Sequence, residues 1–401
     1  MSVLVSPAFD PLSPAQRDVR QLVREIARDT VAARAAEIDE SDAFPWDIVD
    51  VYRETGLFGL LFDEDCGGVG ESALLTLVAI EELAKASLTC AGILSVQDLG
   101  ALAIKLAGSR EQKQAFLPPL ASGERLAAYA LTEAEAGSDS AAMLTQARRV
   151  GDGYVLSGTK RFITNAGVAH LYVCFAKTDA SRGTKGVTAF VVDADSPGCV
   201  VGRVEAKMGL KGSPTGELVL ADCVVPAANR LGAEGDGFRI AMQVLDRSRP
   251  AVAAQALGLA QGATDYAVDY ARTRQTMGKP IGKHQLIAAM LADMETGCEV
   301  SRAFLYKVGQ MIDEGLSGPL LTKYSAMCKL HCTDVAMRVT TDAVQVLGGY
   351  GYVREHPVER MMRDAKITHI YEGTNQIQRL VIGRELLRET GRTLAASISP
   401  V

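Results

Sequence analysis

Hydrophobic positions recur at helical spacing through both ends of the chain. Ser13 and Pro14 form a typical helix start, and the apolar residues after them repeat with a period close to 3.6. Further helices are predicted at about 46–56, 72–87, 92–107 and 109–121, so the first 125 residues or so are expected to be helical. From Gly237 the helical pattern returns, with predicted helices over 238–274, 285–314, 318–345 and 375–388.

The middle of the chain has a different pattern, with short β-type runs separated by Gly, Pro or Asp. These runs cover 153–160, 171–178, 186–194, 199–205 and 216–226. The order is helices, strands, helices, and the absence of βαβ alternation argues against a Rossmann-type sheet. Gly235 and Gly237 form only a fragment of a dinucleotide fingerprint. We therefore predict an α+β protein with an N-terminal α-helical domain (1–128), a middle β domain (129–236) and a C-terminal α-helical bundle (237–401).

Length and composition narrow the class of protein. A chain of 401 residues is long enough for two or three domains. Its net charge of −6 gives it no general attraction for nucleic acid or anionic lipid. The first residues, Met1–Pro7, have no basic segment followed by an apolar one, and there is no run of about 20 apolar residues. No signal peptide and no membrane span are expected, and a bacterial cytoplasmic protein is predicted.

The eight cysteines are scattered, which favours reduced thiols over disulfides. Cys328, His331 and Cys332 lie within about one helical turn and could be read as half a metal site. No second Cys/His pair stands nearby at ligand spacing. Buried helix thiols are the favoured interpretation, and no metal site is predicted.

Three stretches combine glycines, hydroxyls and charged residues in a way that favours a binding site. Residues 129–140 gather small residues and hydroxyls, although a surface turn would explain them when taken alone. Residues 161–167 place Phe162 and Thr164 between strands, where a hairpin connection is the simpler interpretation. In 345–386, Glu372 stands on a turn before a predicted helix, and an isolated Glu there is typically a solvated charge or a cap.

Together these stretches resemble the acyl-CoA dehydrogenase family. The segments LTEAEAGSD, FITNAG, LGGYGY with PVERMMRDAKI, and IYEGTNQIQR occur in the family's order and spacing, and the resemblance covers nearly the whole chain. It implies an N-terminal helical domain, a middle β-barrel or sandwich and a C-terminal four-helix bundle. It also implies FAD-dependent conversion of an acyl-CoA to the trans-2-enoyl-CoA, with electrons passed to electron-transferring flavoprotein. The family assembles as a homotetramer, a dimer of dimers.

The resemblance also implies which residues hold FAD. Phe162 stands where many members have Trp, and Met277 stands where the family usually has Phe. Arg274 would reach the FAD pyrophosphate of a neighbouring subunit, a task that suits a forked, permanently charged side chain. The matched FAD residues are Tyr129, Leu131, Thr132, Ser138, Phe162, Ile163, Thr164, Arg274, Met277, Gln285, Gln345, Gly348, Gly349, Thr374 and Gln376.

The catalytic base implied by the resemblance is Glu372. Some relatives place the base on the helix that here carries LDRSR (245–249), but the equivalent residue is Ser248, which cannot act as a carboxylate base. The matched substrate-binding residues are Ser138, Phe238, Met242, Asp246, Arg249 and Gly373.

Three alternatives share the same fold. An acyl-CoA oxidase would be expected to be longer, with an additional C-terminal domain. A catalytically degenerate subunit of a heteromer would be expected to lack an intact Thr164, Arg274 or Glu372. A DNA-associated relative would carry a basic C-terminal extension, whereas this chain ends at Val401 and is acidic.

The acyl group stays open at this stage. Residues 91–108 resemble short-chain members of the family, while 246–261 resemble medium-chain members. The Arg expected in a glutaryl-type pocket is absent from Cys90–Gly92.

Overall fold

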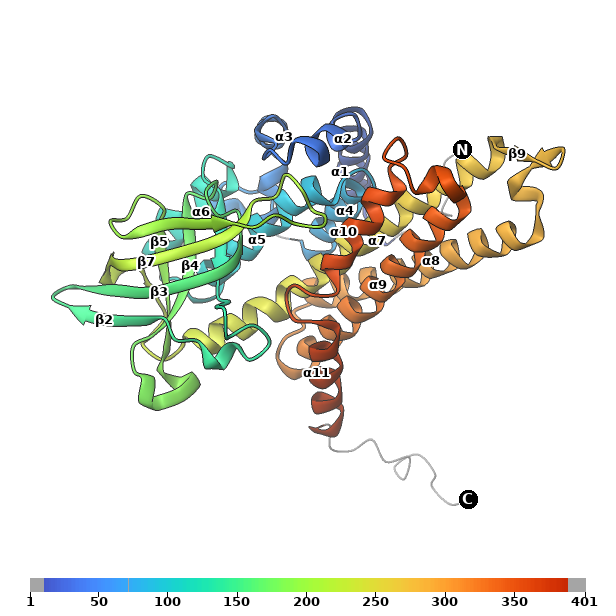
Figure 1. The fold of residues 1–401 in the computed structure, drawn as a ribbon. Coiled ribbons are helices and arrows are strands. Elements are labelled where there is room, and N and C mark those ends of the chain that lie inside the picture. Colours follow the sequence, from blue (N-terminus) through green and yellow to red (C-terminus); the bar gives the residue numbers. More distant parts are fainter. Residues whose placement is uncertain (1–10, 71, 389–401) are drawn as a thin grey trace, which may run out of the picture.

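In the computed structural model, which describes residues 11–70 and 72–388, helices from both ends of the chain pack against one face of a β-sheet (Figure 1). The expected order of helices, strands and helices is confirmed. The segment Met1–Pro7, on which the signal-peptide prediction rests, and the end of the chain at Val401 lie outside the described residues.

The N-terminal part is helical, as predicted. Ser13 caps the first helix, since its Oγ accepts from the Gln16 N–H at 3.2 Å and the Gln16 side chain accepts from the Ser13 N–H. Ser109 forms the same kind of capping box three residues before Gln112. The helices are α1 (Pro14–Ile26), a π-helical turn (Ala27–Val31), α2 (Ala32–Ser41), α3 (Trp46–Glu54), α4 (Ala73–Ala84), α5 (Leu88–Ala107) and α6 (Arg110–Ala121).

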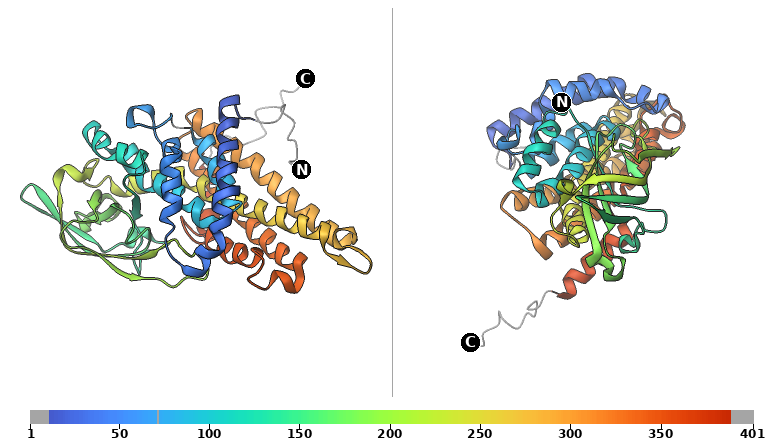
Figure 2. Two further views of the ribbon diagram at one scale, coloured as in Figure 1. Left: turned by 90° about the horizontal axis from the view of Figure 1, so that it is seen from above. Right: turned by 90° about the vertical axis from the view of Figure 1, so that its left-hand side faces the viewer.

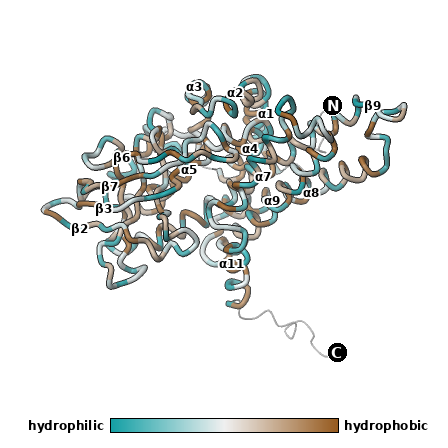
Figure 3. Tube along the Cα trace, in the orientation of Figure 1, coloured by the Kyte–Doolittle hydropathy of each residue, from teal (hydrophilic) through white to brown (hydrophobic). Residues whose placement is uncertain are grey.

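Helix α5 runs through the interior of the molecule (Figure 3). By length and composition alone it is the one helix among the described residues that could cross a membrane, and 61% of its apolar window is buried inside the protein. It packs against α4, α7 and β1. Its Asp98 and Lys105 pair with each other at 2.8 Å. These contacts are those of a core helix.

A single mixed sheet forms the middle of the chain. Its strands are β1 (Ala127–Ala130), β2 (Gln146–Val150), β3 (Gly153–Thr164), β4 (Leu171–Lys177), β5 (Val187–Asp193), β6 (Cys199–Val204), β7 (Thr215–Pro226) and β8 (Arg230–Leu231). The order is β6-β7-β3-β2-β4-β5-β8, with β1 paired to β4 in parallel. The five predicted runs are strands, whereas β1, β2 and β8 were not predicted.

The two faces of the sheet belong to different cores. Along β4, Tyr172 and Cys174 belong to a core formed within the sheet layer, while Val173 and Phe175 belong to the helical core. Alternation of this kind follows from the two-residue period of a strand. The sheet is thereby fixed to α5 and α7, and the region between them can serve as a rigid site.

The C-terminal part consists of α7 (Gly237–Thr273), α8 (Gln285–Asp313), α9 (Gly318–Leu347), α10 (Val358–Thr368) and α11 (Asn375–Arg388), with a small hairpin of β9 (Gln275–Thr276) and β10 (Lys279–Pro280). Helix α10 was not predicted. Helix α7 packs along α9, α4 and α5 and so joins both helical parts (Figure 2). A Cβ at Gly258 of α7 would lie 2.1 Å from the Glu81 carbonyl oxygen, so α7 and α4 can approach this closely only with glycine there. The domain limits at 128/129 and 236/237 stay predictions.

Candidate active site

A cavity of about 1150 Å³ lies between the sheet and the helices. Its walls come from the segment after β1, the end of β3, and helices α5, α7, α10 and α11. Most of the residues predicted for FAD and substrate line this one cavity. They are Tyr129, Leu131, Thr132, Ser138, Phe162, Ile163, Thr164, Phe238, Met242, Asp246, Arg249, Glu372, Gly373 and Thr374.

The remaining predicted FAD residues do not line this cavity in the single chain. They are Arg274, Met277, Gln285, Gln345, Gly348, Gly349 and Gln376. The Arg274 guanidinium lies 4.9 Å from the centre of the Tyr350 ring, in the short 3-10 helix Gly348–Gly351. The hairpin that carries Met277 stands at the end of the molecule opposite the sheet (Figure 1). Apart from Gln376, which stands at the start of α11 only four residues after Glu372, these residues form a second group away from the cavity.

Glu372 stands on the turn between α10 and α11. Its φ is +52° and that of Gly373 is +91°, so two consecutive residues occupy the left-handed region. A non-glycine residue in this region is uncommon and costs on the order of 1–3 kcal/mol, which surrounding contacts must offset. Gln378 provides part of these contacts, because its Nε2 donates to the Glu372 carbonyl oxygen at 3.2 Å and to the Gly373 carbonyl oxygen at 2.9 Å.

The Glu372 carboxylate is surrounded by groups that set its proton affinity. Burial raises its pKa above the ordinary value, while a hydrogen bond from Ser248 and the charges of Arg249 and Lys329 lower it; the net shift is upward. The Ser248 hydroxyl donates to Glu372 Oε2. A carboxylate with a raised pKa at the wall of a cavity is suited to act as a general base. Position 248 therefore contacts the Glu372 carboxylate directly.

A buried ion pair on α7 lies beside this carboxylate. Arg249 Nη1 donates to Asp246 Oδ1 at 2.7 Å, and only 6% of the Arg249 side chain is exposed. Thr322 of α9 donates to the other Asp246 oxygen at 2.5 Å. Arg249 Nε also approaches the Glu372 carbonyl oxygen at 3.5 Å. Asp246 thus holds Arg249 in place, and the pair fixes one side of the cavity.

The wall formed by the sheet fits a flat, polar ring. A register shift after Lys160 marks a β-bulge near the end of β3, and Phe162 there has φ +57° and 57% of its surface exposed. The hydroxyls of Thr132, Ser138 and Thr164 donate to no acceptor within the described part of the chain. Three available hydroxyl donors and an exposed aromatic ring thus line the same cavity, as the expected FAD ring would require. Phe162 and Thr164 belong to β3 itself and not, as expected, to a connection between strands.

Some residues of the cavity were missed by sequence reasoning. Gly92, Ser95, Val96 and Leu99 contribute from α5. Gln255 of α7 donates to Ser95 and accepts from the Tyr371 hydroxyl at 2.5 Å. The one available signal was the presence of polar residues within strongly apolar helices, a pattern that any satisfied core polar group also produces.

Comparison with known proteins shows what this chain is similar to. Residues 13–124, 128–223 and 235–387 match the family models described as acyl-CoA dehydrogenase N-terminal, middle and C-terminal domains. A protein of Clostridium acetobutylicum described as acyl-CoA dehydrogenase, short-chain specific, is 47% identical over 94% of this chain and 99% of its own length.

Solved structures agree with this similarity. The butyryl-CoA dehydrogenase of Megasphaera elsdenii gives a TM-score of 0.92 at 43% identity, over 94% of this chain and 100% of that chain. A chain from a structure described as the electron transferring flavoprotein of Acidaminococcus fermentans also gives 0.92 at 43% identity, over 95% and 100%. The predicted family resemblance and the predicted architecture are confirmed.

Ser248→Ala should raise the pKa of Glu372, because the variant removes a donor to the charged carboxylate. A hydrogen bond to a charged group stabilises the charged form, so its loss favours the protonated carboxyl. Infrared difference spectra recorded against pH would follow the protonated carboxyl band, with Glu372→Gln to assign it. A band that appears at the same pH in Ser248→Ala and in the parent protein would contradict this account of the site.

Proposed function

The chain belongs to the acyl-CoA dehydrogenase family, and we propose that it oxidises the α–β carbon bond of an acyl-CoA with Glu372 as the catalytic base. The observation that carries this proposal is the position of Glu372. Its carboxyl has a raised pKa and stands at the wall of a cavity of about 1150 Å³ that also contains the hydroxyls and the exposed ring suited to FAD.

The protein's own groups account for the proton transfer. The α proton of a thioester is weakly acidic, so a base must remove it while donors stabilise the negative charge on the carbonyl oxygen. Within the described residues the backbone N–H of Glu372 donates to no acceptor, so it is available to the thioester oxygen. Gln378 fixes the carbonyl groups of the same turn, which holds this N–H and the carboxylate in one arrangement.

The residues that line the cavity fit FAD. Thr132, Ser138 and Thr164 would hold the polar edge of the ring, and Phe162 would cover part of it. FAD, when bound, supplies the two-electron acceptor for the β hydrogen. The family is FAD-dependent in general, and the proposal extends this requirement to the present chain.

Electron-transferring flavoprotein is the proposed electron acceptor, in line with the similarity to a chain from a structure described as such a flavoprotein. The relatives named above are bacterial, and a cytoplasmic location is proposed. A catalytically degenerate role is disfavoured because Glu372, Thr164 and Thr132 all line the cavity.

Glu372→Gln should retain FAD and bind acyl-CoA but fail to bleach the flavin. The amide keeps the size of the side chain and cannot accept the α proton, and loss of a general base costs about 10²–10⁴-fold. Anaerobic reduction of the flavin by an acyl-CoA measures this step. Because Ser248 contacts the Glu372 carboxylate, Glu372→Gly combined with Ser248→Glu should recover part of the rate. Near-normal reduction by Glu372→Gln would show that another group is the base.

The acyl group is proposed to be short. Ser95, Gln255 and Tyr371 form one hydrogen-bonded chain on the wall of the cavity, and both Ser95 and Gln255 are buried. Because their polar groups already have partners, turning them aside for a longer chain would leave buried groups unsatisfied. The Clostridium acetobutylicum relative is described as short-chain specific, which agrees with this proposal.

A ferrocenium-coupled assay over straight, branched and dicarboxylic acyl-CoAs should therefore give the highest kcat/KM for a short, straight acyl group. Gln255→Ala should shift the preference towards longer chains, because it removes the middle member of the hydrogen-bonded chain and enlarges the cavity. A parent enzyme that prefers long acyl groups, or an unchanged order of substrates in Gln255→Ala, would contradict the proposal.

A homotetramer is proposed, because the C-terminal part exposes large apolar side chains that a second copy could cover. They include Met277, Leu286, Tyr352, Leu380 and Leu387. Arg274, Gln285, Gln345 and Gly348–Gly349 lie away from the cavity of their own chain, and we propose that they complete the FAD site of a neighbouring subunit.

Arg274→Ala should weaken FAD retention more than it slows flavin reduction in the fully loaded enzyme. The variant removes a charge-assisted contact worth roughly 1.5–3 kcal/mol. FAD content after gel filtration, followed by anaerobic reduction in excess FAD, separates the two effects. Arg272→Ala, two residues away and paired with Asp269 at 3.2 Å, is the matched control. Equal FAD retention in Arg274→Ala and the control would count against the assignment.

A further inference from the structure

Lys329 is a buried lysine on α9 whose function is not explained by the mechanism above. The side chain has no exposed surface. Within residues 11–70 and 72–388, no carboxylate oxygen lies within ion-pair distance of its Nζ. Burying an ammonium group away from a counter-ion is costly, so its retention calls for a specific task.

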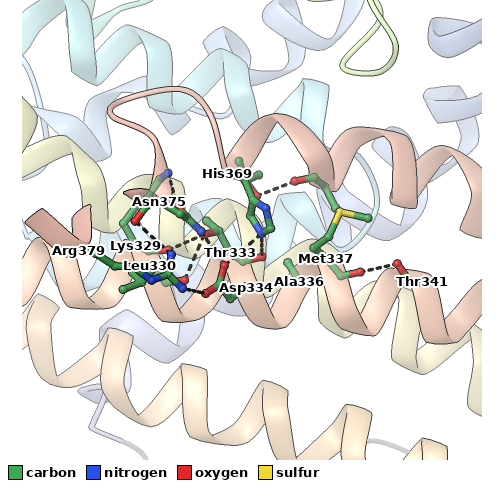
Figure 4. A network of polar contacts seen from close by, with 12 residues as sticks. Lys329, Leu330, Thr333, Asp334, Ala336, Met337, Thr341, His369, Asn375 and Arg379 are labelled. Atoms are coloured by element: carbon green, nitrogen blue, oxygen red, sulfur yellow. Dashed lines mark hydrogen bonds and ion pairs between the residues drawn. The ribbon is translucent and has the colours of Figure 1, made fainter. Parts of the chain in front are cut away.

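Both hydrogen bonds of Lys329 go to the turn that carries Glu372. Its Nζ donates to the Gly373 oxygen at 2.9 Å and to Asn375 Oδ1 at 2.8 Å. Gly373 directly follows the base, and Asn375 is the first residue of α11. Lys329 therefore bridges the turn and the start of the next helix (Figure 4).

Two further side chains of α9 also hold Asn375. Asn375 Nδ2 donates to Thr333 Oγ1 and to Asp334 Oδ1, each at 2.8 Å. Asp334 is held from its other side by Arg379 at 2.9 Å. Figure 4 shows these side chains converging on one stretch of α9.

The network also reaches the end of α10, before the base. His369 Nε2 lies 2.9 Å from the Thr333 carbonyl oxygen, and the Asn375 N–H donates to the His369 carbonyl oxygen at 3.0 Å. The turn is thus tied to α9 on both sides of Glu372. Since Glu372 and Gly373 both have positive φ, such ties are what keep the turn in its left-handed conformation.

We propose that Lys329 is a positioning residue for the base: it holds the Gly373 carbonyl and the Asn375 side chain, and thereby fixes the direction of the Glu372 carboxylate and N–H. The inference rests on the proposed function of Glu372. This positioning role differs from a general role in stability. Loss of Lys329 should misplace Glu372 in an enzyme that still folds and still binds FAD.

Electrostatics give the proposal a second, independent readout. Glu372 is faced by Arg249 from α7, Lys329 from α9, Asp98 from α5 and Tyr129 from β1, and both cations lower its pKa. Burial lowers the pKa of Lys329 to about 7, while the charge of Glu372 raises it and Arg249 lowers it. Removing Lys329 should therefore raise the pKa of Glu372, so that the base form appears at higher pH.

Lys329→Met keeps the length of the side chain and removes both donors and the charge. Lys323→Met is the matched control, since Lys323 is also buried on α9 and its ammonium group lies 5.5 Å from the centre of the Tyr324 ring. Three quantities are measured on each holoenzyme: FAD content, binding of an acyl-CoA product, and the rate constant of anaerobic flavin reduction as a function of pH.

Lys329→Met should keep FAD and bind the acyl-CoA product like the parent, while its rate constant for flavin reduction falls. A misplacement of about 1 Å costs on the order of 10²-fold. The rising limb of its pH profile should move to higher pH. The control should show neither change. A Lys329→Met enzyme with the parent's rate constant and pH profile would overturn the proposal.

Should Lys329→Met fail to give holoenzyme, Asn375→Ala decides the question. It removes the side chain that Lys329 and Asp334 hold but keeps the charge of Lys329, so reduction should slow without the shift in the pH profile. Parent-like reduction in Asn375→Ala would overturn the proposal. A parent enzyme that no acyl-CoA reduces would instead overturn the proposed function itself, and this inference with it.

Discussion

This structure depends on a left-handed turn that must keep its conformation. Glu372 and Gly373 adopt φ values of +52° and +91°, and the carbonyl oxygens of both residues point to buried donors. The donors come from different elements: Gln378 from α11, Arg249 from α7 and Lys329 from α9. Strain on the order of 1–3 kcal/mol persists only where neighbours determine the conformation so fully. The packing of α7, α9 and α11 around one turn follows from this requirement.

The sheet and the helices contribute different parts of the cavity wall. Helices position Glu372 and the buried ion pair of Asp246 and Arg249, whereas the sheet and the segment after β1 bring the hydroxyls to the cavity wall. The β-bulge near Phe162 turns that side chain out of the strand and into the cavity wall. Because β4 contributes alternate residues to both cores, the wall cannot move independently of α5 and α7. The result is one cavity that is lined both by Glu372 and by Phe162 with its neighbouring hydroxyls.

Serine caps and apolar periodicity were enough to predict most helices from the sequence. Ser13 and Ser109 mark starts that the structure confirms. Helix α10 was not predicted; it is short and mostly polar, and no side chain caps its start. Strands β1 and β2 are short, and β1 lacks the alternating polarity on which strand prediction relies.

The residues of the candidate site likewise fall into those that were predicted and those that were not. The residues of the cavity were predicted through the family resemblance, since a lone glutamate on a turn has many simpler explanations. Lys329 and Gln255 were missed because a polar residue inside an apolar helix gives no sign of its partner in sequence. The FAD contact of Arg274 stays a prediction from the resemblance, since Arg274 stacks on Tyr350 away from the chain's own cavity.

The central claim is that this turn holds a carboxylate against the α carbon of a thioester. A structure determined with a bound short acyl-CoA analogue tests it most directly. We expect the α carbon within about 3–3.5 Å of a Glu372 carboxylate oxygen, with the positive φ at Glu372 retained and the thioester oxygen within hydrogen-bond distance of the Glu372 N–H. An acyl chain bound away from Glu372, or a turn that relaxes to negative φ when the ligand binds, would contradict the account.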